Sequence, residues 1–263
     1  VPVATPADEL AALATTINGM LDRIQYGIAE RDRILDSQRM FTANAAHELR
    51  TPLTTMRTAI DVTLDGRPSR ADLLTMAGDV RTAVDHSQRT LDGLLTLARS
   101  QAGPGDPRAV DLAGIVAGAL GNAAGDAAAR DVTVRADLRP APVDGEPTLL
   151  ERMASNMIDN AIRYNHAGGH VDVTTGTGAA RVFVRVANTG PPVPAAETAR
   201  LFEPFVRGER GRARTDGGAG LGLSIVRAIV IAHRGDLAVT ARSAGGLDIT
   251  AHFPEAPARP TPR

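Results

Sequence analysis

The chain has 263 residues, 43% of them hydrophobic, and a net charge of −1, which fits one large domain or two modest ones and gives no reason to expect a nucleic-acid partner. It contains no Cys, which excludes disulfides, zinc–thiolate sites and a cysteine nucleophile. It also contains no Lys, because all 29 basic side chains are Arg, and this excludes the Walker A loop, the Ser/Thr/Tyr-kinase fold and Schiff-base enzymes.

The first hundred residues carry a helical pattern. Apolar residues from Leu10 to Ile28 step by three and four, as in a coiled-coil seam, and a regular heptad runs from Leu73 to Ala98. The turn-forming residues 65–69 separate the two stretches, and Pro52 should kink or loosen the first helix. We predict two antiparallel helices. Because each buries only one stripe, we expect a dimer that completes a four-helix bundle.

The rest of the chain alternates between helical and strand patterns. Residues 101–109 (QAGPGDPRA) have the composition of a linker, and the Pro-rich tail 256–263 is expected to be disordered. No run approaches the roughly 20 apolar residues that cross a bilayer. Between linker and tail we predict an α+β domain with helices at about 111–129, 147–165 and 221–233 and strands at 132–136, 170–175, 181–187, 237–241 and 247–253.

The first candidate site is the string FTANAAHELRTPL at Phe41–Leu53. Apolar side chains recur every fourth residue in it, so they mark a buried face, and His47 should point to solvent. An exposed neutral imidazole with a carboxylate beside it, here Glu48, can act as a nucleophile towards a phosphoryl group. An isolated His-Glu pair, however, is more often an ordinary surface feature.

The second candidate site is the string NMIDNAIRYN at 156–165. On a helix, Asn156, Asn160 and Arg163 fall on one side. An amide oxygen is a ligand suited to Mg²⁺, and an Arg one turn further can reach phosphate oxygens. A merely polar helix face would give the same pattern.

The third candidate site is the Gly-rich string GAGLGLSIV at 218–226. Glycines let a backbone approach phosphates, and the following helix presents free N–H groups. It is not a dinucleotide fingerprint, because Leu223 stands where the last Gly belongs. The preceding Arg- and Gly-rich run at 207–217 is typical of a lid over a nucleotide, or of a disordered surface loop.

These strings together resemble the boxes of the sensor histidine kinases. Residues 41–53 resemble the H box, 156–165 the N box of the GHKL superfamily, LFEPF at 201–205 the F box, and 218–226 the second Gly-rich box. The resemblance covers about residues 36–255. It implies an all-α helical hairpin that forms a dimeric four-helix bundle, followed by an α+β sandwich of the GHKL (Bergerat) ATP-binding fold.

The resemblance also implies roles for individual residues. His47 would be the phospho-acceptor, Glu48 its general base, and Thr51 the residue that positions water when the protein dephosphorylates its partner. Asn160 would hold Mg²⁺. ATP-binding residues implied by the match are Asn156, Asn160, Arg163, Tyr164, Asn188, Gly190, Gly218, Gly220, Leu221 and Gly222.

The first Gly-rich box departs from the family pattern D-x-G-x-G. The string here is VANTGPPV, with Asn188 in place of Asp and Pro192 in place of the second Gly. An Asn oxygen still accepts a hydrogen bond from the adenine amino group, but without charge assistance, and Pro192 stiffens the turn and removes an N–H. We therefore predict weaker ATP binding than is usual, not its loss.

The implied activity is ATP-dependent autophosphorylation of His47 in a homodimer, followed by transfer to an Asp of a response-regulator receiver domain. Residues 8–20 resemble the C-terminal half of a HAMP linker, although a generic coiled coil reads similarly. If residues 8–20 belong to a HAMP linker, this chain would be the cytoplasmic part of a membrane sensor whose membrane spans are missing. The expected division is HAMP-like linker 1–30, dimerisation and phosphotransfer domain 31–100, linker 101–109, catalytic domain 110–255 and tail 256–263.

Two other functions stay open. A non-catalytic scaffold that keeps the dimer is supported only by Asn188 and Pro192. A GHKL ATPase of the chaperone or topoisomerase type is disfavoured by the H box, since those proteins have no phospho-acceptor helix.

Overall fold

The computed structural model describes residues 6–101, 103, 105–178, 181–206 and 219–255, with only the backbone for several of the first 37. It divides into two units at the bond between His47 and Glu48, and each unit is described by itself. The first unit consists of the N-terminal part of helix α1 (Pro6–Leu64). The second contains the remainder of α1, helix α2 and the α+β region.

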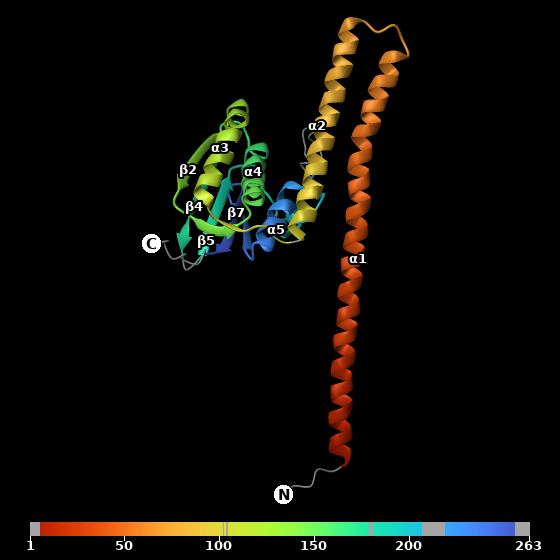
Figure 1. Cartoon of the computed structure of the whole chain (residues 1–263), viewed down its shortest axis with the longest axis vertical. Coiled ribbons are helices and arrows are strands. Elements are labelled where there is room, and N and C mark those ends of the chain that lie inside the picture. Colours follow the sequence, from red (N-terminus) through yellow and green to blue (C-terminus); the bar gives the residue numbers. More distant parts are fainter. Residues whose placement is uncertain (1–5, 102, 104, 179–180, 207–218, 256–263) are drawn as a thin grey trace. The chain divides into compact units, whose positions relative to one another are not determined.

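Helices α1 and α2 (Arg70–Gln101) meet at the predicted break, and from Glu48 onward they form an antiparallel hairpin (Figure 1). Helix α1 continues through Pro52 without a break, and the kink or loosening expected there stays a prediction. Helix α2 begins with a reciprocal cap. The Ser69 hydroxyl accepts from the Asp72 N–H (3.2 Å), and the Asp72 carboxylate accepts from the Ser69 N–H (2.8 Å). The Ser69 hydroxyl also donates to the Asp72 carboxylate (2.8 Å), and this bond, together with the one from the Ser69 N–H, lowers the pKa of Asp72.

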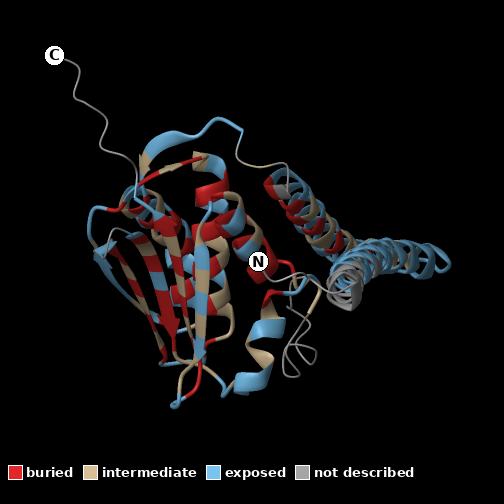
Figure 2. Ribbon diagram, turned by 90° about the horizontal axis from the view of Figure 1, so that it is seen from below, coloured by how far each residue is buried: buried red, intermediate tan, exposed pale blue. Residues whose placement is uncertain are grey.

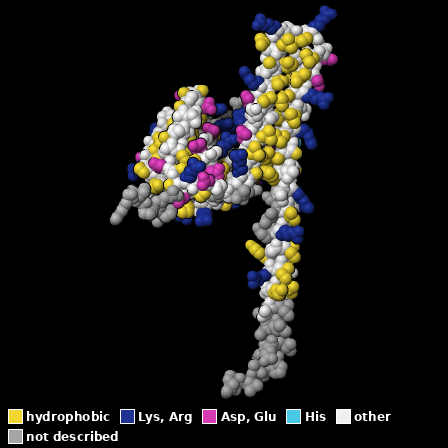
Figure 3. Space-filling model, in the orientation of Figure 1, with side chains coloured by type: hydrophobic (Ala, Val, Ile, Leu, Met, Phe, Trp, Pro, Cys, Tyr) yellow, Lys and Arg dark blue, Asp and Glu magenta, His cyan; other side chains and the backbone are white. Residues whose placement is uncertain are grey.

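The predicted heptad of α2 is largely exposed in the single chain. Val84 is 37% exposed and Leu91 47%, and apolar side chains run along the hairpin in Figure 3. Another face of α2 is covered by the N-terminal end of helix α5 (Gly222–Ala232), where the side chains of Leu221 and Ile225 lie against Gly93. The seam is therefore available for a second copy of the chain, as the dimer prediction requires.

The α+β region is built on a mixed five-stranded sheet in the order β2-β4-β5-β7-β6. Strands β2 and β4 are parallel, and the other neighbours are antiparallel. Strands β1 and β3 form a separate antiparallel pair, and β1 is the first element after α2. The strands are β1 Arg108–Asp111, β2 Thr133–Leu138, β3 Pro142–Gly145, β4 His170–Gly178, β5 Arg181–Asn188, β6 Asp236–Ala241 and β7 Leu247–Pro254.

Three helices cover one face of this sheet: α3 (Leu112–Ala129), α4 (Pro147–Arg163) and α5. The strands alternate accordingly. In β5, Val182, Val184 and Val186 are buried, while the residues between them are less so (Figure 2). The buried core thus lies between helices and sheet, and the other sheet face is polar.

Helix α3 corrects one expectation. By length and composition it is the one helix, among the described residues, that could cross a membrane. The sequence prediction overlooked this because Gly and Ala dominate the helix. Leu112, Val116 and Ala119 of α3 are buried, and the helix packs on α4, which accounts for its apolar character as a core helix.

The predicted elements are confirmed with ends shifted by a few residues. Strands β1 and β3 and two 3₁₀ turns, η1 (Ala195–Glu197) and η2 (Ala199–Phe202), were missed. The proposed linker is wrong at its end, because β1 begins at Arg108. The predicted disordered tail lies outside the described residues.

Candidate functional site

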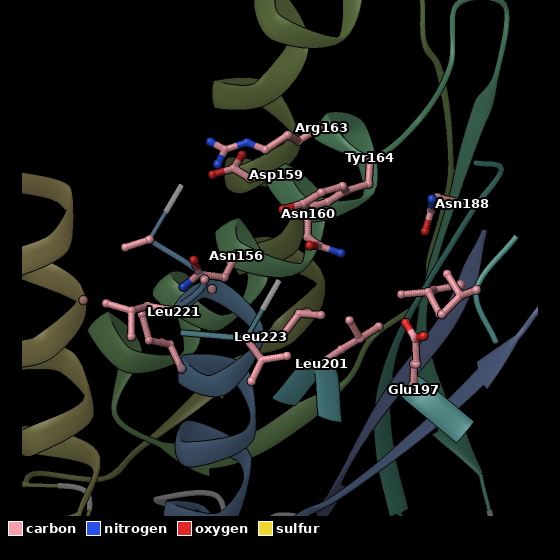
Figure 4. A pocket seen from close by; sticks show the side chains of 18 of the residues that line it. Asn156, Asp159, Asn160, Arg163, Tyr164, Asn188, Glu197, Leu201, Leu221 and Leu223 are labelled. Carbon is pink, nitrogen blue, oxygen red and sulfur yellow. The ribbon is translucent and has the colours of Figure 1, made fainter. Parts of the chain in front are cut away.

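A cavity of about 430 Å³ opens beside α4, at the ends of β5 and α5 (Figure 4). Its volume is in the range of small-molecule and cofactor sites. It collects residues from four of the predicted boxes, which are spread over residues 156–226 of the sequence. The predicted residues that line it are Asn156, Asn160, Arg163, Tyr164, Asn188, Gly220, Leu221 and Gly222.

The polar face of α4 forms one wall. Asn156, Asn160 and Arg163 lie on the side predicted, because the opposite side of the helix is buried in the core. The Asn156 Nδ2 donates to the Arg152 carbonyl oxygen (2.9 Å), which orients the amide. Its Oδ1 then lies 3.4 Å from where a Cβ at Gly222 would be, so a glycine there leaves room beside the amide.

Two charged residues of α4 lie at the same wall, where Figure 4 shows Asp159 beside Arg163. Asp159 keeps exposed surface, yet partial loss of solvent raises the pKa of its carboxyl, and the Arg163 guanidinium opposes that rise. Arg152 lies one turn before Asn156 and pairs loosely with Asp92 of α2 (3.7 Å). The wall therefore offers guanidinium groups suited to phosphate oxygens.

The Gly-rich segment meets the F box through the backbone. The Phe205 N–H donates to the Gly220 carbonyl oxygen (3.0 Å), and Gly220 has φ +73°. A Cβ on Gly220 would lie 3.0 Å from the backbone of Phe205, so glycine is required by conformation and by space. Leu221 is buried, and Gly222 begins α5, whose first N–H groups have no partners within the helix. Gly218 and the proposed lid lie outside the described residues.

Asn188 ends β5 at the opposite side of the cavity in Figure 4. It is only 4% exposed, and its Nδ2 donates to the Thr189 carbonyl oxygen (2.7 Å). Its Oδ1 accepts no hydrogen bond from any residue that the structure describes. Pro192 lines the cavity as well, whereas Gly190 does not line it and packs on the chain after α4. A Cβ on Gly190 would lie 2.6 Å from the Tyr164 carbonyl oxygen.

Sequence reasoning missed part of the lining. Arg152 could have been predicted from the helix spacing, because it lies four residues before Asn156 on the same helix face. Glu197 comes from the missed 3₁₀ turn η1, and no periodicity marks it, whereas Leu201 is the first residue of the predicted F box and lies on η2. The α2 residues His86, Arg89, Thr90 and Gly93 also line the cavity, and only tertiary contact reveals them.

The H box lies on α1. His47 is exposed, as predicted, and Thr51 is exposed on the next turn, while Glu48 is half-buried. The expected buried face is only partly covered in one chain, because Phe41 is half-buried and Leu53 is 60% exposed. The imidazole is therefore accessible to a reactant, and the apolar face around it keeps exposed surface in a single chain.

The described residues contain no cluster of three or more acidic, His or Cys side chains that could hold a metal alone. Asn160 contributes one amide oxygen at the cavity. Magnesium commonly takes few protein ligands and completes its shell with phosphate oxygens and water. The donor set therefore suits a magnesium ion that arrives with a nucleotide.

Two family models match the chain. The His Kinase A (phospho-acceptor) domain matches residues 37–103, and the histidine kinase-, DNA gyrase B- and HSP90-like ATPase matches residues 145–257. The sensor protein CutS of Streptomyces coelicolor is 39% identical over 250 residues, which cover 95% of this chain. This chain belongs to the sensor histidine kinases. It spans 59% of the length of CutS, about three-fifths of that relative.

Solved histidine kinases share this fold. The Acinetobacter baumannii kinase AdeS superposes with a TM-score of 0.63 at 23% identity, covering 79% of this chain and 97% of AdeS. The kinase ThkA, solved in complex with the response regulator protein TrrA, gives a TM-score of 0.66 at 20% identity, covering 86% of this chain and 64% of ThkA. At these identities the likeness concerns the fold, a helical hairpin followed by a GHKL-type α+β domain.

Proposed function

We propose that this chain is the catalytic region of a sensor kinase that uses ATP to phosphorylate His47 and passes the phosphoryl group to an Asp of a response-regulator receiver domain. The observation that carries the proposal is the cavity beside α4, which unites the N-box amides, an Arg and the Gly-rich segment in a chain that also exposes an H-box histidine. The two family models support both halves of the reaction.

In the first step a nitrogen of the His47 imidazole attacks the γ-phosphorus of ATP. An N–P bond forms while the bond between the γ-phosphorus and the β–γ bridging oxygen breaks, and ADP leaves with that electron pair. Glu48, next to His47, accepts the proton from the other ring nitrogen. In the second step the N–P bond breaks as a receiver carboxylate oxygen bonds to phosphorus.

The chain contributes mainly by holding ATP in position and by stabilising the negative charge of its phosphates. We assign the adenine end to Asn188 and the phosphate end to Arg163 and the Gly-rich segment, since these lie on different walls of the cavity. Asn160 would hold a magnesium ion, which neutralises phosphate charge when bound, and Asn156 and Tyr164 would support the nucleotide. Leu221 buries its side chain against Gly93 of α2.

Two partners are proposed, a second copy of the chain from the exposed hairpin and a receiver domain from a solved relative. The exposed seam of α2 supports a homodimer. ThkA was solved with a response regulator, and by analogy we propose a receiver domain as the phosphoryl acceptor here. Thr51, one turn after His47, would position water when the same protein dephosphorylates that partner.

We also propose a HAMP-like segment 1–30, a dimerisation and phosphotransfer domain 31–100, and a catalytic domain that begins with β1 at Arg108 and runs to residue 255. The HAMP-like pattern of residues 8–20 and the family of sensor relatives support a cytoplasmic placement beside a membrane-spanning sensor.

One experiment tests the reaction. The protein is incubated with γ-labelled ATP and Mg²⁺ as wild type, as His47→Gln and as the control His252→Gln, a half-buried histidine of β7 that does not line the cavity. Acid-labile, base-stable label on wild type and control, absent from His47→Gln, is expected. Hydrolysis without labelled protein would instead point to an ATPase, and no nucleotide chemistry would point to a scaffold.

A further inference from the structure

A buried polar cluster lies directly behind Asn188. Asn165 follows the end of α4, and Thr189 follows the end of β5. Asn165 is buried and Thr189 half-buried, and both meet the backbone of His170 at the start of β4. Neither residue lines the cavity, so neither is placed to touch a nucleotide there.

The side chain of Asn165 uses both of its polar atoms. Its Oδ1 accepts from the Thr189 hydroxyl (2.7 Å) and from the His166 N–H (3.0 Å), and its Nδ2 donates to the His170 carbonyl oxygen (3.1 Å). The donors and acceptors on either side allow only this orientation of the amide. Asn165 therefore joins the end of α4 to the edge of the sheet in one geometry.

Thr189 is held from two directions. Its hydroxyl accepts from the His170 N–H (2.8 Å) while it donates to Asn165, and its own N–H donates to the His170 carbonyl oxygen (3.0 Å). Its carbonyl oxygen then accepts the Asn188 Nδ2 (2.7 Å). The Thr189 carbonyl oxygen thus holds the Asn188 nitrogen, which leaves Oδ1 as the amide atom that can face the cavity lined by Asn188.

Glycines surround the cluster where it is tightest. A Cβ on Gly169 would overlap the Asn165 Oδ1 and would lie 2.6 Å from the Thr189 hydroxyl oxygen. A Cβ on Gly190 would lie 3.2 Å from the Asn188 Nδ2. Larger residues at either position would push these hydrogen-bonding groups apart.

The orientation matters because this protein has Asn where its family usually has Asp. A carboxylate presents an acceptor to the base whichever way it turns, whereas an amide presents an acceptor in one orientation and a donor in the other. An acceptor matches the exocyclic amino group of adenine, and a donor matches the exocyclic carbonyl of guanine. An Asn in this place selects a base only if something fixes its orientation.

We propose that Thr189 and Asn165 are positioning residues that set the base selectivity of this site, by holding the Asn188 amide with its acceptor towards the cavity. This inference rests on the proposed function, since it assumes that a nucleoside triphosphate binds there. The chemical class selected is a purine triphosphate with an exocyclic amino group at the position facing Asn188.

The test compares the binding of ATP, GTP and purine riboside triphosphate, which lacks the exocyclic group, to the full chain by calorimetry. Wild type is expected to bind ATP about tenfold more tightly than either other ligand, the size of one good hydrogen bond. Thr189→Val removes the hydroxyl at nearly constant volume, and we expect it to reduce the ATP-to-GTP ratio at least threefold. Binding of purine riboside triphosphate should stay unchanged.

Four further variants make the result specific. Thr189→Ser keeps the hydroxyl and should keep the wild-type ratio, as should the exposed control Thr240→Val on β6. The double variant Asn188→Asp with Thr189→Val should regain the ATP preference, because a carboxylate needs no fixed orientation. Asn165→Ser should lower the ratio as Thr189→Val does, and it replaces that variant if the valine does not fold.

The outcomes separate the two proposals. A wild-type ratio in both Thr189→Val and Asn165→Ser, or an equal loss of all three ligands, would overturn the positioning role and leave the kinase proposal intact. A wild-type protein that binds none of the three ligands would overturn the proposed function itself.

Discussion

The helical hairpin and the α+β region of this protein bury their apolar residues in different ways. In the α+β region, Ile229 and Val226 of α5 are fully buried under the sheet. In the hairpin, Leu91 and Leu74 keep about half or more of their surface exposed in a single chain, and Figure 2 shows the contrast between the two regions. One region completes its core within a single chain, and the other leaves an apolar stripe exposed, which we propose is buried against a second copy.

The largest expected effect tests whether the exposed apolar seam of the hairpin is a dimer interface. Replacing Val84 and Leu91 together by Glu puts two charges into the α2 seam, where they would be buried without partners in a bundle. We expect the dimer to dissociate into monomers that still bind ATP, as measured by light scattering and calorimetry. Thr82→Glu, exposed off the seam, should stay dimeric, and a doubly substituted protein that remained dimeric would place the interface elsewhere.

The next effect tests the self-contained core. Ile229→Ala deletes a side chain with 0% exposure and should lower the free energy of unfolding of the α+β region by about 2–5 kcal/mol. Ile231→Ala on the same helix, where the side chain is 60% exposed, should change it by less than about 0.5 kcal/mol. Urea denaturation measures both. Equal losses would mean that the exposed face of α5 is covered in solution.

A smaller effect concerns the departure from the family pattern at Asn188. Asn188→Asp gives the adenine amino group a charged acceptor, and charge-assisted hydrogen bonds are roughly twice as strong as neutral ones. We expect ATP to bind about three- to tenfold more tightly by calorimetry, with the oligomeric state unchanged. Ordinary affinity in the wild type, unaltered by the substitution, would contradict the prediction of weakened binding.

The smallest effect is a pH dependence at the cavity wall. Because partial loss of solvent raises the pKa of Asp159 in the folded protein, this residue favours folding most when protonated, and that contribution is lost as the pH rises through its folded pKa. Asp159→Asn should therefore stabilise the fold by less than about 1 kcal/mol near pH 7, a value reduced by solvent screening. The gain should vanish below the ordinary aspartate pKa of about 3.9.

Thermal unfolding across pH measures this difference, with Asp79→Asn on the exposed surface of α2 as the control. A destabilised Asp159→Asn protein at neutral pH would show that the attraction between Asp159 and Arg163 outweighs the desolvation of the carboxyl.

Much of the fold could be predicted from the sequence because its periodicity is local. The break at residues 65–69, both long helices and the five strands of the main sheet were found from spacing alone. Strands β1 and β3 were missed because four-residue segments are too short to show alternation, and their pairing joins residues more than thirty positions apart. The 3₁₀ turns that carry Glu197 and Leu201 show no period either.

The sequence predicts which residues carry the chemistry. The H-box histidine and the Asn and Arg positions of α4 follow from helix spacing and from the family resemblance, because both are written in consecutive residues. Only the folded chain shows which residues lie behind and around these predicted site residues. Folding brings Asn165 to Thr189, across 24 residues, so that hydrogen bonds through a shared backbone can orient Asn188. Such an orientation depends on distances between segments, which no local pattern encodes.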